Sequence, residues 1–582
     1  MPNIRIMLWL ALAAILYLNY EAWVRDYPDI AAAAGAAATP STAPALGESV
    51  PQAAVPATPA AAGAADLQQS IPVPQAAASA VPSAPATVSA AAMLHVSTDV
   101  LELDINLKGG ELDRADLRDY PLRKDAPNIP VRLLNQDSPA TLYVLQSGLT
   151  GEAGEAAPSH LATWSSSGSS FELGAGATEL RVPLIWSDGH GLTVTKTFVL
   201  TRGRYAIDLI YDVRNDSTAA RKLAAYSQFL RHWEHASRSY FDVETYAFKG
   251  PAIYDGTKYR KLNVESDEDS KFAETITNGW LASMQHHFVG AIVPAADKPY
   301  KYLLQVRGAD YLLGATGPIT EIAAGGTGQF RERLFIGPKL QAQLEAAGPR
   351  LELTADYGKL TVLAKPLFAL LNWIHGIIGN WGWSIIIVTA LIKLLFYPLS
   401  QASGRSMAKM RAVAPRLKQI QETFKDDREK LGRAMMELYK KEKINPLAGC
   451  LPMLVQIPFF ISFYRVLLES VEMRQAPFLL WVNDLSSRDP YFVLPLLMGG
   501  AMLWQSHLAP ASPGMDQSQA KMMRYMPLIF LVFLYTYSSG LALYMTVSTL
   551  LGVLQTKLTK NLRDPAAPMT NPALTPASKN KK

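Results

Sequence analysis

The chain of 582 residues carries 55 Lys or Arg against 50 Asp or Glu, and 49% of its residues are hydrophobic. This length allows several domains, and the formal net charge of +5 is too small to indicate a nucleic-acid partner. The single cysteine, Cys450, excludes an intrachain disulfide framework, so each domain must be stabilised by its own core.

The first 95 residues predict a membrane anchor followed by a linker. Residues 6–18 are apolar and lie between Arg5 and an acidic flank, which indicates an anchor over residues 1–22 whose N-terminus is cytoplasmic. A cleaved signal peptide is the alternative, because the apolar run is short. Residues 23–95 consist mostly of Ala, Pro, Ser and Thr, a composition that cannot bury enough apolar surface to fold.

Residues 96–345 predict a large antiparallel β-sandwich. Apolar and polar side chains alternate over residues 101–108 before a Gly-Gly turn, and residues 192–200 and 205–213 have the pattern of a hairpin. His286 and His287 are adjacent and would point to opposite faces of a strand, so no metal site is predicted here.

The next segment, residues 346–380, is expected to contain an amphipathic helix on the outer membrane surface. Leucine and isoleucine recur at spacings of three and four between residues 360 and 378, with polar residues elsewhere on the cylinder. Tryptophans at positions 373, 381 and 383 would lie at the depth of the lipid head groups. A buried helix of the β-domain is the alternative.

Residues 381–400 predict a second span with a charge, Lys393, inside its apolar run. A lysine at that depth costs on the order of 3 kcal/mol and usually has a water-filled cavity or a partner. Thr389, Tyr397 and Ser400 share its helical face, so a polar stripe covers the inner half of the span. This pattern indicates a cleft that is open on one side. Snorkelling of the lysine to the nearer surface is the alternative.

Residues 401–443 hold twelve Lys or Arg against six Asp or Glu, so the positive-inside rule places this segment in the cytoplasm. Its apolar spacing predicts a hairpin of two helices broken near residues 425–428.

Residues 444–557 then predict four further spans, and residues 558–582 a basic cytoplasmic tail. The apolar runs are 447–468, 491–504, 525–538 and 541–554. Gln456 lies in the first run at about the depth of Lys393. With the anchor, the count is six spans with both termini cytoplasmic.

Several stretches of the chain form long, distinctive motifs. In the apolar part they are NWGWSIIIVTALIKLLFYPLS (380–400), SMAKMR (406–411), KINPLAGCLPMLVQIPFF (443–460), RQAPFLLWVNDLSSRDPY (474–491) and SSGLALYMTVS (538–548). In the β region they are TDVLELDINLKGGELDRADL (98–117) and QSGLTGEAG (146–154). These stretches resemble the YidC membrane protein insertases, and the resemblance extends over nearly the whole chain except the linker and the tail.

The resemblance implies a helical polytopic membrane core with a large all-β periplasmic supersandwich. It also implies a hydrophilic groove that is open to the cytoplasm and to lipid but closed to the periplasm. The residues implied at the groove or on the substrate face are Lys393, Thr389, Gln456, Phe460, Thr536 and Tyr544. Lys393 stands where the family most commonly has arginine, and it keeps the charge but lacks the planar fork. Thr536 stands where an aromatic residue is common.

We therefore expect an inner-membrane insertase and folding chaperone for nascent membrane proteins, acting in the lipid bilayer alone or with the Sec translocon. The basic hairpin and tail are candidate contacts for ribosomes or targeting factors. No phosphate-binding glycine loop is evident, so no nucleotide is expected. For an insertase, neither a cofactor nor enzymatic activity is expected. One alternative is a small-solute transporter, although the spans show no internal repeat. The other is an intramembrane hydrolase that pairs Lys393 with Ser462 or Ser538.

Overall fold

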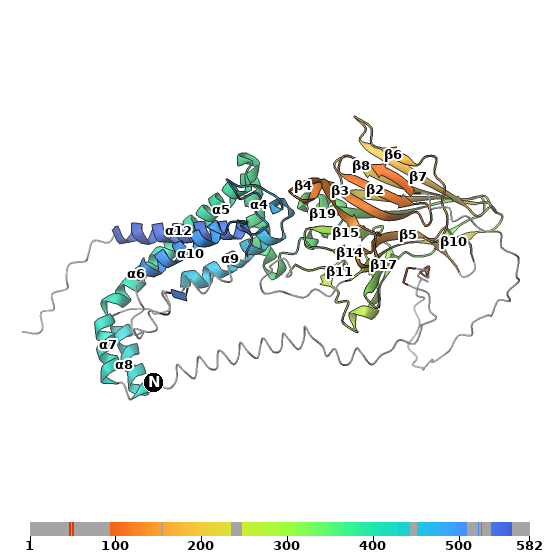
Figure 1. The fold of residues 1–582 in the computed structure, drawn as a ribbon. Coiled ribbons are helices and arrows are strands. Elements are labelled where there is room, and N and C mark those ends of the chain that lie inside the picture. Colours follow the sequence, from red (N-terminus) through yellow and green to blue (C-terminus); the bar gives the residue numbers. More distant parts are fainter. Residues whose placement is uncertain are drawn as a thin grey trace, which may run out of the picture.

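The computed structural model describes residues 46–47, 49–51, 93–152, 155–233, 247–424, 427–442, 451–508, 522, 525–526 and 537–561. An all-β part and a helical part lie next to each other, and the chain passes from one to the other at α4 (Thr361–Ile378) (Figure 1).

The larger sheet of the β part has the strand order β13, β16, β17, β10, β5, β3, β2, β1, β6, with β4 beside β3 and β18 beside β10. All of its described pairings are antiparallel except the parallel pair of β1 and β6. In chain order its strands are β1 (Met93–Ser97), β2 (Leu101–Asn106), β3 (Glu111–Arg123), β4 (Ala126–Leu134), β5 (Tyr143–Gly151), β6 (Ser170–Glu172), β10 (Arg221–His232), β13 (Ala273–Thr277), β16 (Pro299–Arg307), β17 (Asp310–Thr316) and β18 (Thr320–Ile322).

The smaller sheet has the strand order β12, β11, β14, β15, β19, β9, β8, β7. In chain order its strands are β7 (Glu179–Ser187), β8 (Leu192–Thr201), β9 (Ala206–Asn215), β11 (Gly250–Tyr254), β12 (Tyr259–Lys261), β14 (Trp280–Met284), β15 (Phe288–Val293) and β19 (Thr327–Pro338). The predicted hairpin is therefore confirmed as β8 and β9, which pair in register from Leu192 with Asn215 to Leu200 with Ile207.

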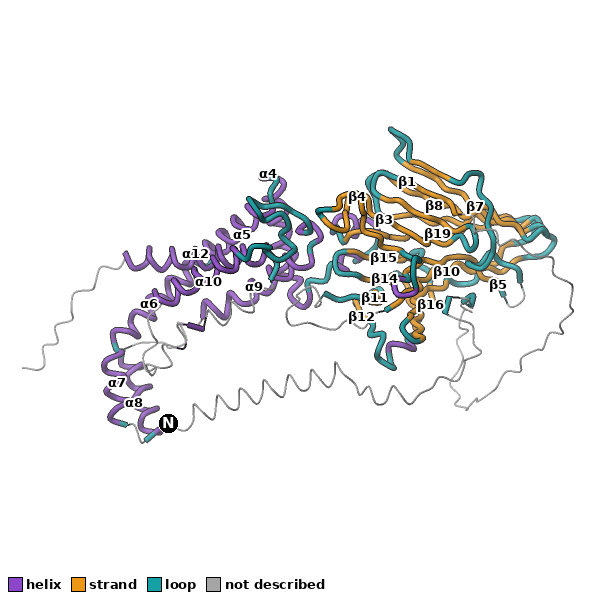
Figure 2. Tube along the Cα trace, viewed as in Figure 1, coloured by secondary structure: helices purple, strands orange, loops and turns teal. Residues whose placement is uncertain are grey.

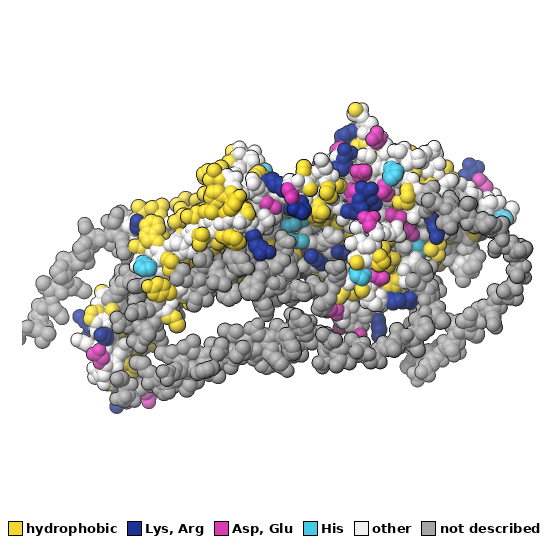
Figure 3. Space-filling view, in the orientation of Figure 1, with side chains coloured by type: hydrophobic (Ala, Val, Ile, Leu, Met, Phe, Trp, Pro, Cys, Tyr) yellow, Lys and Arg dark blue, Asp and Glu magenta, His cyan; other side chains and the backbone are white. Residues whose placement is uncertain are grey.

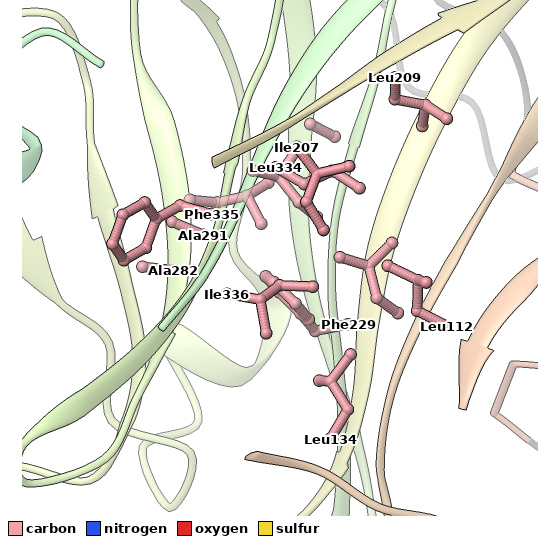
Figure 4. Close-up of a cluster of buried hydrophobic side chains, with 14 of the residues drawn as sticks. Leu112, Leu134, Ile207, Leu209, Phe229, Ala282, Ala291, Leu334, Phe335 and Ile336 are labelled. Carbon is pink, nitrogen blue, oxygen red and sulfur yellow. The ribbon is translucent and has the colours of Figure 1, made fainter. Parts of the chain in front are cut away.

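The two sheets pack face to face, and their inner side chains form one continuous hydrophobic core (Figure 4). The alternation seen in the sequence explains this arrangement, because Leu101, Leu103 and Ile105 of β2 are fully buried. Each buried side chain of this kind stabilises the fold by roughly 1.5–3 kcal/mol. Gly109, in the turn after β2, has a φ of 91°. The predicted β-sandwich is confirmed.

The helical part follows the sandwich (Figure 2). Its α-helices, after the short α3 (Gln341–Ala347), are α4 (Thr361–Ile378), α5 (Trp381–Leu395), α6 (Tyr397–Ala412), α7 (Ala414–Thr423), α8 (Arg428–Lys441), α9 (Leu451–Glu469), α10 (Val493–Leu508) and α12 (Ser539–Asn561). The short 3-10 helices of the chain are η1 (Pro139–Thr141), η3 (Asp269–Lys271), η4 (Leu351–Thr354), η5 (Gly358–Leu360) and η7 (Val471–Met473).

Helix α4 lies at the end of the helical part nearest the sandwich and packs on α5 and α9 (Figure 1). Leu367, Leu371 and Ile374 are buried on one face, whereas Trp373 and Ile377 on the other face are exposed. One face of α4 is therefore packed and the other exposes apolar side chains, and the interfacial position of this helix stays a prediction. By length and composition alone, α4 and residues 539–558 could each cross a membrane, as could the bent pair of α5 and α6 taken as one span, within the described ranges.

The sandwich continues into α4 along the chain, and it also contacts the outer end of α9 through hydrogen bonds. His286 Nε2–H donates to the carbonyl oxygen of Leu468 at 3.0 Å. The hydroxyl groups of Tyr357, in the connector before α4, and Ser470, just after α9, lie 3.4 Å apart. The sandwich and the helical part therefore meet over several non-consecutive segments.

The structure corrects two predictions about the sandwich. His286 and His287 do not lie on opposite faces of a strand, because they occupy the turn between β14 and β15 with their rings stacked 3.8 Å apart. The predicted linker ends earlier than residue 95, since β1 begins at Met93 and buries Leu94 and Val96 against β2. Among the residues that the structure describes, no cluster of three His, Cys, Asp or Glu side chains could hold a metal ion.

Several predicted segments lie outside the described residues, and for them the predictions stand as they are. These are the anchor at residues 1–22, the linker apart from 46–47, 49–51 and its last residues, most of the span at 525–538 including Thr536, and the tail beyond residue 561.

Candidate functional site

Lys393 lies near the inner end of α5, at the border between its buried and exposed faces. The helix begins at Asn380, whose side chain accepts a hydrogen bond from the backbone N–H of Trp383 at 3.1 Å. Ile392 beside Lys393 is buried, Leu394 is exposed, and the Lys393 side chain is partly buried. Within the described part of the chain, Lys393 has neither a hydrogen bond nor an ion pair.

Thr389 lies one turn before Lys393 but faces the interior of the helical part. Its side chain is 1% exposed, and its hydroxyl donates to the carbonyl oxygen of Ile385 at 2.6 Å. Because this bond satisfies the hydroxyl within its own helix, Thr389 contributes to packing at the back of the site.

The polar stripe expected over residues 389–400 does not run straight. Helix α5 ends at Leu395, and α6 starts at Tyr397 in a direction bent by 53°. Pro398 explains the break, because proline cannot donate the hydrogen bond that would continue α5 but fits the first turn of α6. Tyr397 and Ser400 therefore lie on a different helix axis from Lys393, and the straight stripe was a wrong expectation.

The contact between Phe396 and Phe459 sets the register of α5 against α9. Their ring centroids lie 4.9 Å apart in an edge-to-face arrangement. The two helices run in opposite directions, Lys393 is one turn outward from this contact, and Gln456 is one turn inward. These two side chains are therefore separated by about 9 Å along the helix axes instead of being level. Gln456 is partly buried.

Phe460 and Tyr544, which were both predicted at the groove or substrate face, are in contact. Their rings are stacked with centroids 5.9 Å apart, and Phe463 packs edge to face on Tyr544 at 5.0 Å. Tyr544 is 3% exposed, whereas Phe460 is partly exposed. Tyr544 therefore belongs to the packed interior between α9 and α12, and Phe460 lies in front of it.

Ser462, one of the two serines considered for a hydrolase, does not have the geometry for that role. Ser462 is fully buried, and its hydroxyl donates to the carbonyl oxygen of Pro458 at 2.7 Å. A nucleophile needs its base within hydrogen-bond reach. Lys393 has no hydrogen-bond partner among the described residues, and the Ser462 hydroxyl is bonded within its own helix, so neither residue supports this alternative.

Residues 474–487 cover the outer ends of α5 and α12, a role that sequence reasoning missed. The backbone N–H groups of Ser539 and Gly540, at the start of α12, donate to the carbonyl oxygens of Ser487 at 2.7 Å and Leu485 at 2.8 Å. Leu485 is buried in the helical core, where Val482 of the same segment is also buried. The apolar run at residues 476–482 between charged residues was the available signal.

Gly382 at the start of α5 allows this cover to approach closely. A Cβ atom at this position would lie 2.0 Å from Cδ2 of Phe478, so the ring occupies the space that any side chain would need. The side-chain amide of Asn380 donates to the carbonyl oxygen of Phe478 at 3.2 Å. The outer end of the site is thus closed by packed and hydrogen-bonded protein.

Large apolar side chains are exposed along the helices, as expected for surfaces that face lipid. They form the hydrophobic surface of the helical part in Figure 3. On α5, α9, α10 and α12 they include Leu391, Leu394, Leu395, Leu454, Ile457, Ile461, Leu496, Leu497, Leu550 and Leu554.

Beyond the site, the hairpin of α7 and α8 follows its prediction with one difference. Asp427 caps α8 by accepting a hydrogen bond from the backbone N–H of Lys430 at 3.0 Å, which explains the break near residues 425–428. Arg416 of α7 pairs with Glu442, just after α8, at 2.6 Å. The first of the two predicted helices is divided into two, because α6 ends at Ala412 and α7 begins at Ala414.

Two family models match the chain. The model described as 60Kd inner membrane protein matches residues 373–566, and the model described as YidC periplasmic domain matches residues 93–370. The membrane protein insertase YidC of Thioalkalivibrio sulfidiphilus is 43% identical over 573 residues, which cover 95% of this chain and 97% of that protein. The membrane protein insertase YidC of Methylococcus capsulatus is 45% identical over 473 residues, which cover 81% of this chain and 85% of that protein. A solved structure of an active YidC insertase with its first transmembrane domain resolved is 17% identical, with a TM-score of 0.35 and coverage of 81% of this chain and 93% of that chain.

Proposed function

This chain belongs to the YidC family of membrane protein insertases, and from that membership we propose that substrates pass along Lys393, Gln456 and Phe460. The protein is an insertase and not an enzyme, its substrates are nascent membrane proteins, and it acts in the lipid bilayer with a periplasmic domain. The route through these residues is the proposal. Thr389 and Tyr544 form the buried wall behind them, and Thr536 completes the expected set from the span outside the described residues.

The observation that carries this route is the contrast between the two ends of α5. At the outer end, Phe478 and its neighbours close the space between helices. Near the inner end, Lys393 is partly exposed and has no counter-ion among the described residues. A charge in that position favours water on the inner side, so a polar segment can enter from the cytoplasm but meets a barrier before the periplasm.

The energy for insertion comes from the substrate. An apolar segment gains about 25 cal/mol for each Å² of apolar surface that it removes from water, which drives it into the lipid beside α9 and α5. The short polar tail that must cross the bilayer passes Lys393, whose ammonium group attracts acidic residues. Water in the inner part of the route shortens the distance that this tail must cross without water.

We also propose the topology and the partners that the loop charges support. The anchor at residues 1–22 together with five further spans places both termini in the cytoplasm of an inner-membrane protein. The hairpin of α7 and α8 and the basic tail are the surfaces on which ribosomes or targeting factors would bind. Cooperation with the Sec translocon is a further proposal.

The test is insertion of a small single-span substrate into liposomes that contain the purified full-length chain. The substrate is made with an acidic tail and with a neutral tail of the same length. We expect Lys393→Met to slow insertion of the acidic-tail substrate by roughly tenfold. A tenfold change in rate corresponds to about 1.4 kcal/mol, slightly more than the free energy that an exposed ion pair contributes. Lys393→Arg keeps the charge and should retain most of the rate.

The neutral-tail substrate is the internal control and should respond much less to Lys393→Met. High salt should narrow the difference between the two substrates, because screening weakens the attraction between the charges. If the Lys393→Met variant inserted each substrate at the same rate as the unmodified chain, at every salt concentration, Lys393 would have no part in the mechanism.

A further inference from the structure

The outward face of the larger sheet carries buried side chains where exposed ones are expected. Gln146 of β5 pairs with Gln228 of β10, and Tyr226 lies on the same face. These three side chains are only 6%, 2% and 0% exposed. The opposite face holds the core residues Leu145 and Phe229, so it is not the sandwich interior that buries the first three.

Two segments cover this face. One is the loop at residues 155–162, which can approach because Gly148 of β5 has no side chain. A Cβ atom on Gly148 would lie 2.9 Å from the carbonyl oxygen of Pro158. The other cover is a short piece of the predicted linker, described at residues 46–47 and 49–51, where Gly47 is buried. The expectation that the whole linker is unpacked was therefore wrong at this point.

His160, carried by the covering loop, holds the linker piece. Its side chain is 1% exposed, and burial lowers its pKa, so the imidazole is neutral. The Tyr226 hydroxyl accepts the backbone N–H of His160 at 2.9 Å and lies 2.6 Å from Nδ1, so it donates its own proton to that nitrogen. The remaining nitrogen, Nε2, therefore carries the hydrogen and donates to the carbonyl oxygen of Gly47 at 2.5 Å.

Gly47 fits this place because it is glycine. Its φ of 85° lies in the left-handed region, which other residues adopt only with strain. A Cβ atom would lie 2.8 Å from Cδ2 of Leu230 and 3.2 Å from Oε1 of Gln146. Both the backbone conformation and the space around Gly47 thus select against any side chain.

The surface that receives Gly47 is polar. The Gln146 side chain accepts a hydrogen bond from the Gln228 amide at 2.8 Å and donates to Glu111 at 3.3 Å. The surface around Gly47 therefore presents amide groups, an imidazole and the apolar tip of Leu230. Such a surface suits an uncharged backbone with small side chains.

We propose that this surface, formed by Gln146, His160, Gln228 and Leu230, is a binding site for glycine-containing peptide segments rich in small residues. In this chain the site is occupied by the described linker residues 46–47 and 49–51. The linker returns from there to β1 through about forty residues, which gives an effective concentration on the order of millimolar. Even weak intrinsic affinity therefore keeps the site filled from within the same chain.

The test uses the full-length chain and a fluorescent peptide with the sequence of residues 43–53. Gly47→Val in the chain empties the site without changing the sandwich, and the peptide should then bind. The unmodified chain should bind it roughly tenfold or more weakly, because its own segment competes. A peptide that carries Gly47→Val should not bind either chain, and adding His160→Phe to the Gly47→Val chain should weaken binding of the original peptide.

Thermal unfolding of each variant checks that the sandwich is intact, and a photoreactive residue at Val50 gives an independent reading. In the otherwise unmodified chain it should cross-link to fragments that contain residues 146 or 228–230, and Gly47→Val should abolish those products. Equal peptide binding by the unmodified and Gly47→Val chains, or no binding by either, would overturn the proposal. Cross-links that persist at the same yield in Gly47→Val would also overturn it.

Discussion

Replacing Tyr544 separates a packing role from a substrate-contact role at the proposed route. Its ring is 3% exposed and packs against Phe460 and Phe463 at centroid distances of 5.9 and 5.0 Å. Tyr544→Ala removes both aromatic contacts and leaves a cavity between α9 and α12. Large-to-small substitutions in well-packed cores cost about 3–5 kcal/mol, of which each aromatic pair accounts for about 0.5–1.5 kcal/mol.

We expect the lower end of that range, because lipid competes with the protein interior for apolar groups and the loss is mainly one of packing. Tyr544→Phe keeps the ring and should cost less than about 1 kcal/mol. Thermal unfolding in detergent measures both variants, and insertion into liposomes is measured in parallel. Tyr544→Ala should lose stability and insertion together, whereas Tyr544→Phe should keep both.

The reasoning would be refuted if the Tyr544→Phe variant mediated insertion poorly but unfolded at the same temperature as the unmodified chain. That result would mean that the hydroxyl group meets the substrate or the water of the groove, although the side chain is buried in this structure. It would move Tyr544 from the wall to the route itself.

Two further predictions concern the sandwich and the outer closure. Burial raises the pKa of Glu111 to about 7, with a further contribution from Asp113, so the folded state holds a proton that the unfolded state loses above about 4.5. The stability that Glu111 contributes is therefore lost as the pH rises through 7. The free energy of unfolding of Glu111→Gln should exceed that of the unmodified chain by roughly 1–3 kcal/mol between pH 5 and pH 8, as measured by urea unfolding. Gly382→Ala places a Cβ atom in the space of the Phe478 ring and should cost about 1–3 kcal/mol, whereas the matched Gly376→Ala in α4 meets nothing within 4 Å and should be neutral or slightly stabilising in thermal unfolding. A flat pH dependence of the Glu111→Gln difference, or equal effects of the two glycine variants, would contradict these predictions.

Local patterns in the sequence were sufficient for the class of fold. The alternation in β2 and in the β8–β9 hairpin reports which side chains face a core, because side chains on a strand point to opposite faces in turn. Long apolar runs likewise predict helices that meet lipid, and the twelve basic residues at 401–443 predict the cytoplasmic side. Each of these signals lies within one segment and needs no knowledge of its neighbours.

Contacts between distant segments had to come from the tertiary structure. The bend at Phe396, the closure of the outer end by Phe478 against Gly382, and the burial of Tyr544 each depend on which helix or loop packs where. The same holds for Gly47, whose linker composition indicates no packing at all. Its place is set by His160 and Leu230, which lie more than a hundred residues away in the chain.

The sequence by itself thus determined the sandwich, the lipid-facing helices and a charge within one of them. Only the tertiary structure decided which polar and aromatic residues stand at the front of the route and which form its wall. The physical reason is that periodicity reports the burial of a residue relative to its own element, whereas a site is made by elements that meet from far apart.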